Sequence, residues 1–182
     1  MLFFCVALVS LRAGGPTVTA VILSTGRINA RINPGIELGT PGFVVETKIE
    51  NQSTDSYVVV YPCCSWDECW TVQPRDDFHI LSWDCAKNFL VKDALRQGDG
   101  VIFKFTIVAN RKDTIIEGRK IKLGFIEAFG MPNSPIIWSK ELVVPESSDQ
   151  LSYVQPEIKG IRKHTVTRGV QPISLKAQAA GH

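Results

Sequence analysis

The sequence predicts an all-β protein: an antiparallel β-sandwich of about seven to eight strands, with a flexible C-terminal tail. Three observations predict this fold. Apolar and polar residues alternate with a period of two over several segments, β-branched and aromatic residues fill those segments, and turn-forming residues separate them. Such alternation is typical of strands with one buried and one solvent-exposed face, as antiparallel sheets provide.

The clearest alternation lies in residues 43–50, 101–108 and 119–129. In each of them the odd-numbered residues form a mainly apolar face that we expect to be buried. These residues are Phe43, Val45, Thr47, Ile49, Val101, Phe103, Phe105, Ile107, Ile121, Leu123 and Phe125. Four further strands are expected, at 17–24, 56–61, 77–81 and 136–144. Residues 86–97 fit either a helical or a strand period, and we interpret them as a strand that enters a turn, or at most as one helical turn.

The chain is expected to divide into a signal peptide over 1–15, one domain over 16–146 and a flexible or partner-ordered tail over 147–182. The apolar run from Leu2 to Leu11 is too short to span a bilayer as a helix and is followed by small residues, as in secretory signals. A first buried strand is the alternative. The tail loses the alternation and gains polar and small residues, which favours flexibility.

Composition and motifs exclude several classes of function. The chain has 182 residues and a net charge of +2, which implies no particular partner. The basic stretch KGIRKH, residues 159–164, has no interleaved aromatic residue and is too small to indicate nucleic acid. It lacks the G-x-S-x-G and H-E-x-x-H motifs, a phosphate-binding loop and a dinucleotide-binding glycine turn. We therefore expect no enzymatic activity and no cofactor. A sequon at Asn51–Ser53 would accept a glycan in a eukaryotic secretory protein.

The stretch YPCCSWDECW, residues 61–70, holds three of the five cysteines. In an exported chain, Cys63, Cys64, Cys69 and Cys85 predict two disulfides. Neighbouring Cα atoms lie about 3.8 Å apart, below the roughly 4.4 to 6.8 Å that disulfides need, so a Cys63–Cys64 bond is disfavoured. Two pairings stay open: Cys63–Cys69 with Cys64–Cys85, or Cys63–Cys85 with Cys64–Cys69.

Other chemistry for this region is weaker. The cysteine spacing lacks the paired knuckles of structural zinc sites. His79, flanked by Phe78 and Ile80, suits a strand residue that faces solvent or is hydrogen-bonded in the wall of the sandwich more than a catalytic base. Calcium needs six to eight oxygen ligands. The acidic residues do not have the spacing of a calcium loop, and they are expected to form a solvated rim. They are Asp67, Glu68, Asp76, Asp77 and Asp84.

Three stretches resemble an immunoglobulin-like domain. TPGFVVETKIENQSTDSYVVVY, from residue 40 to 61, is similar to its second and third strands. LRQGDGVIFKFTIV, from 95 to 108, resembles the turn that opens a late strand in bacterial accessory sandwiches. IKLGFIEAF and IIWSKELVV then resemble the closing hairpin. The resemblance covers roughly residues 17 to 145 and implies a fold only, without a function.

These observations favour a non-catalytic binding or accessory module that is secreted, periplasmic or on the cell surface. Its expected contact surface is a disulfide-pinned loop with Trp66, Asp67, Glu68 and Trp70, which would recognise another protein or a surface glycan. One alternative is an assembly subunit of a surface layer or particle that docks through its C-terminal arm by strand addition. A second alternative is a proteinase inhibitor.

Overall fold

The structure is a computed structural model that describes residues 14–29, 36–82, 89–127, 131, 133–147, 151 and 156–161. Strands dominate these residues. They are β1 Pro16–Arg27, β2 Pro41–Asn51, β3 Tyr57–Pro62, β4 Trp70–Gln73, β5 Phe78–Ile80, β6 Leu90–Leu95, β7 Gly100–Ala109, β8 Lys120–Ile126, β9 Ile136–Trp138, β10 Leu142–Val143 and β11 Glu157–Ile161. One short 3₁₀ helix, η1 Trp66–Cys69, precedes β4. The predicted all-β class is confirmed.

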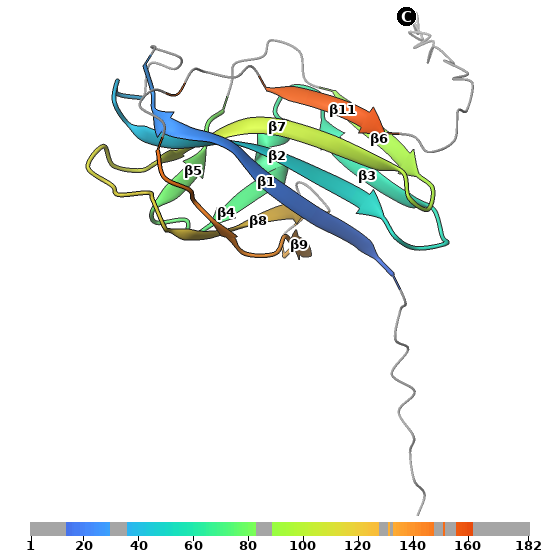
Figure 1. The fold of residues 1–182 in the computed structure, drawn as a ribbon. Coiled ribbons are helices and arrows are strands. Elements are labelled where there is room, and N and C mark those ends of the chain that lie inside the picture. Colours follow the sequence, from blue (N-terminus) through green and yellow to red (C-terminus); the bar gives the residue numbers. More distant parts are fainter. Residues whose placement is uncertain are drawn as a thin grey trace, which may run out of the picture.

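The strands form three antiparallel sheets. The largest has the order β1-β2-β7-β11, and β5 also pairs with β7. A second sheet has the order β10-β8-β4, with β9 paired to β8, and β3 pairs with β6 alone. Figure 1 shows the layer of β4 and β8 lying under the layer of β1, β2 and β7. Among the described residues, no helix is long and apolar enough to cross a membrane.

An aromatic layer joins the two main sheets. The ring of Trp70 on β4 lies 5.3 Å from that of Phe103 and 5.6 Å from that of Phe105, both on β7. Its distance to Phe125 on β8 is 5.3 Å. These edge-on and tilted arrangements are those that aromatic pairs prefer. The predicted inward faces of β2, β7 and β8 are confirmed, since their odd-numbered residues from 43, 101 and 121 onward are buried.

The structure differs from the sequence predictions at the C-terminal end of the domain. Within the predicted tail, Leu151 is buried against Ile28 and Val44. Strand β11 also lies there, and it pairs with β7 so that Ile158 stands opposite Phe103. Part of the tail therefore belongs to the fold, because β7 still has backbone groups to pair along this edge. Residues 1–13 and 162–182 lie outside the described residues.

Candidate functional site: a groove between β4 and β5

The predicted disulfides are not formed as expected. Cys63 and Cys69 are thiols, and no disulfide joins two described cysteines; the sulfur atoms of Cys63 and Cys64 are 3.6 Å apart. This removes both bridges of the second pairing and the Cys63–Cys69 bridge of the first. Cys85 lies outside the described residues, so a Cys64–Cys85 bridge stays a prediction.

Cys69 lies in the core of the protein as a thiol. Helix η1 turns its side chain into the core, where it is fully buried. Burial raises the pKa of its thiol to about 12, and the nearby carboxylates of Glu68 and Asp67 add to this rise. Backbone contacts hold the segment in place instead, because the Cys63 N–H donates to the carbonyl oxygen of Phe89 at 2.8 Å.

Trp66 and Trp70 do not form the exposed contact surface that the sequence predicts. Their exposed fractions are only 3% and 4%, and both rings pack on Phe103 and Phe105. Indoles are large and mainly apolar, so the gain from burying them in the aromatic layer exceeds any gain from exposure. Glu68 remains exposed, whereas Asp67 is buried with them.

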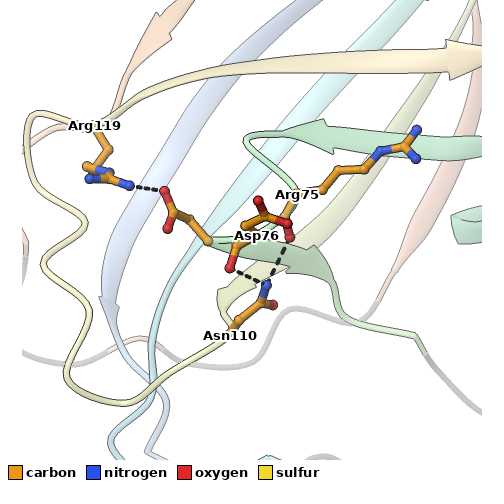
Figure 2. A network of polar contacts seen from close by, with 5 residues as sticks. Arg75, Asp76, Asn110 and Arg119 are labelled. Atoms are coloured by element: carbon orange, nitrogen blue, oxygen red, sulfur yellow. Dashed lines mark hydrogen bonds and ion pairs between the residues drawn. The ribbon is translucent and has the colours of Figure 1, made fainter.

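The turn after β4 is fixed by Asn110, at the end of β7. Its side-chain Nδ2 donates to the carbonyl oxygens of Arg75 and Asp76, each at 2.9 Å. Its backbone N–H donates to the carbonyl oxygen of Asp77 at 2.8 Å. Asp77 also forms an ion pair with Arg119. Figure 2 shows this network, with the Arg75 side chain extending away from it. The turn thereby directs β5 onto β7 while β4 stays on β8.

Because β4 and β5 join different sheets, a groove opens between them. Its volume is about 410 Å³, within the range of roughly 300 to 1,000 Å³ for small-ligand sites. Its lining mixes apolar and polar side chains from η1, β4, the turn, β5 and β8. The lining residues are Asp67, Trp70, Thr71, Val72, Arg75, Phe78, His79, Ile80 and Ile126.

Two buried polar atoms in this lining lack partners. Among the described residues, neither Asp67 Oδ1 nor Trp70 Nε1 has a hydrogen-bond partner. Burial raises the pKa of the Asp67 carboxyl from 3.8 to about 6, and hydrogen bonds from the backbone oppose the rise. An unsatisfied buried group costs about 1 to 3 kcal/mol. Two of them in one groove therefore require an explanation.

The rim of the groove is polar and bears charge. The Arg75 Nε donates to Thr71 Oγ1 at 2.9 Å, and His79 Nδ1 lies 2.5 Å from Asn110 Oδ1. His79 is exposed on β5, which confirms that it faces solvent. His79 also lines a second hollow of about 340 Å³, together with Arg111 and Lys112.

Sequence reasoning identified only part of this groove. Asp67 and Trp70 lie in it, as parts of the predicted contact loop, whereas Trp66 and Glu68 do not line it. Arg75 and Thr71 were missed, since their roles depend on a change of sheet at a turn and no local pattern shows such a change. The expected acidic rim is divided: Asp67 is buried, Asp77 pairs with Arg119, and Asp84 lies outside the described residues.

Neither metals nor relatives define the site further. The described part of the chain contains no group of three or more His, Cys, Asp or Glu side chains that could hold a metal ion. Comparison with models of known protein families gives no match, and comparison with curated proteins gives none either. The proposal for function therefore depends on the groove itself.

Proposed function

We propose that this chain is a non-catalytic binding module, an exported immunoglobulin-like sandwich that holds its ligand in the groove between β4 and β5. The observation that carries this proposal is the pair of unsatisfied polar atoms, Asp67 Oδ1 and Trp70 Nε1. One atom accepts and the other donates, so a ligand that offers both a donor and an acceptor satisfies them. The terminal torsion of an Asp side chain is soft, which lets Oδ1 turn toward a ligand.

The groove supports binding more than catalysis. Its side chains supply hydrogen bonds and apolar contact, as in sites that orient a ligand. The nearby thiol of Cys69 is buried and has a pKa raised to about 12, so it is protonated and unreactive at neutral pH. The proposed location is secreted, periplasmic or at the cell surface, and the ligand is a protein or a surface glycan.

The test presents two probe collections to the full chain: a displayed library of random dodecapeptides and an array of surface oligosaccharides. We expect at least one probe to bind, and its affinity to fall tenfold or more in Asp67→Asn and in Arg75→Ala. Glu68→Gln is the matched control, because Glu68 neighbours Asp67 but lies outside the groove lining. Equal binding by all variants, or no binding of any probe, contradicts the proposal.

A second candidate is an assembly subunit, and β11 favours it. This strand has five residues, of which Glu157, Lys159 and Gly160 are exposed, so its contact with β7 is largely through the backbone. Such a strand can be exchanged for that of a second copy. Molar mass in solution, measured with and without residues 156–182, tests this: loss of an oligomer on truncation favours assembly, and a monomer in both forms contradicts it.

A further inference from the structure

The register of β4 directs the backbone groups of Val72 away from β8. Val72 stands opposite Leu123 of β8. The backbone N–H and C=O of Leu123 point to the edge of β8 that faces away from β4. Its C=O accepts from the Ser139 N–H at 2.8 Å, and its N–H donates to Ser139 Oγ at 3.0 Å. In an antiparallel ladder, two residues opposite each other either bond to each other or both point away. The N–H and C=O of Val72 therefore point away from β8, on the groove edge of β4.

Two residues of β5 also direct their backbone groups away from the strand with which they pair. Its ladder with β7 extends at both ends, because the Asn110 N–H donates to the Asp77 oxygen at 2.8 Å and the Leu81 N–H to the Thr106 oxygen at 2.9 Å. Bonding alternates along an antiparallel strand. Phe78 and Ile80 therefore direct their N–H and C=O groups away from β7. No hydrogen bond within the described part of the chain uses them, and both residues line the groove.

We propose that the groove binds an extended polypeptide segment of another protein, which adds as a strand to the outer edge of β5. This inference rests on the proposed binding function and specifies its ligand. A peptide backbone presents N–H and C=O groups in alternation, which matches the open edge of Phe78 and Ile80. The same backbone offers the donor that Asp67 Oδ1 lacks and the acceptor that Trp70 Nε1 lacks.

The lining also suits a peptide side chain. Between β4 and β5 the floor is apolar, formed by Val72, Phe78 and Trp70. Alternate side chains of an added strand point to the same face. One side chain of the peptide therefore packs on this apolar floor, while its two neighbours point outward. Asp67 and Arg75 carry opposite charges, which favours the paired dipoles of a backbone over a ligand of one sign. A strand rises about 3.3 Å per residue, so pairing along β5 covers roughly three residues.

The test uses peptides selected from the random dodecapeptide library on the full chain. Each backbone amide of a selected peptide is N-methylated in turn, and binding is measured by calorimetry. We expect a loss of tenfold or more at every second amide within one stretch, and little change at the amides between them. On the protein side, Ile80→Pro removes an outward N–H and leaves the ladder with β7 intact, so we expect a similar loss; thermal unfolding checks that this variant folds.

The outcomes separate this inference from the proposed function. If N-methylation has no alternating effect, or if only oligosaccharides bind, strand addition is overturned while a binding groove that depends on Asp67 and Arg75 survives. If no probe depends on Asp67 and Arg75, both fall. Should Ile80→Pro fail to fold, the N-methyl scan of the peptide still decides.

Discussion

Asp67 lowers the stability of the fold at neutral pH. Its carboxyl is buried and its pKa is raised to about 6, so ionisation at neutral pH destabilises the folded chain. Because the folded protein holds this proton more tightly than the unfolded chain does, the contribution to stability is fully present below about pH 4 and is lost as the pH rises through 6.

Replacing Asp67 by Asn should remove this pH dependence. A pKa difference of two units corresponds to about 3 kcal/mol, so we expect the variant to gain about 1 to 3 kcal/mol relative to the parent between pH 4 and pH 7.5. Urea unfolding of both proteins at the two pH values measures it. The difference in unfolding free energy between the two pH values does not contain the effect of burying the Asn amide, because that effect is the same at both. The same change in both proteins would show that Asp67 titrates normally.

Asn51 has a structural role that its sequon conceals. Its side-chain Nδ2 donates to the carbonyl oxygens of Asp55 and Leu95 at 2.7 and 2.9 Å, and its Oδ1 accepts from the Ser53 N–H at 2.9 Å. The residue is fully buried. The folded protein therefore cannot present Asn51 as a glycan acceptor.

We accordingly expect Asn51→Ala to lower the free energy of unfolding by about 2 to 4 kcal/mol, since it leaves buried backbone groups unsatisfied. Chemical denaturation measures the loss, and Gln52→Ala, at the exposed neighbour, is the control. A loss below about 0.5 kcal/mol, the size of an ordinary surface change, would contradict the assigned role.

At the scale of elements, Gly124 permits the close approach of β9 to β8. A Cβ added there would lie 2.5 Å from Ile136 Cγ2 and 2.9 Å from the ring of Trp138. Real side chains do not approach so closely, so β9 would have to move. Gly160 in β11 offers the contrast, because a Cβ there meets nothing within 4 Å.

Gly124→Ala should therefore destabilise the protein by about 1 to 3 kcal/mol, as overpacking of a core does. Gly160→Ala should change the stability little. Thermal unfolding of both variants compares the two sites directly. Equal melting temperatures would mean that β9 adjusts without cost.

Local patterns predicted most of the strands, although not β4 or β11, and predicted their connections poorly. Period-two alternation identified β2, β7 and β8 because each has one face in the aromatic layer. The ambiguous segment 86–97 contains β6, as predicted. Strand β11 escaped detection because its half-buried residues, Ile158 and Ile161, are too few to form a pattern. The groove was beyond prediction since it depends on which sheet β4 and β5 each join.

At the scale of the whole molecule, the sandwich is held by its aromatic layer and its ladders, and Cys63 and Cys69 form no disulfide. The sequence could not reveal this. Four cysteines close together match the pattern of disulfides in exported proteins, and that pattern does not show how deeply each side chain is buried. Depth was decided by η1, whose turn buries Cys69 beside Trp66 and Trp70. Whether a cysteine forms a disulfide therefore depends on its position in the tertiary structure as much as on the redox state of its surroundings.

Thiol labelling of the folded protein tests this view of the whole molecule. With iodoacetamide at pH 8, we expect Cys63 to be alkylated and Cys69 to stay unmodified, because Cys69 is fully buried and its pKa is raised to about 12. In denaturant without reductant, Cys69 should react as well. If Cys64 and Cys85 are bridged, they should react only after reduction, and peptide mass spectrometry distinguishes all four. Rapid labelling of Cys69 in the folded chain would show that η1 opens, and the floor of the groove would then not be the fixed surface that the proposed binding requires.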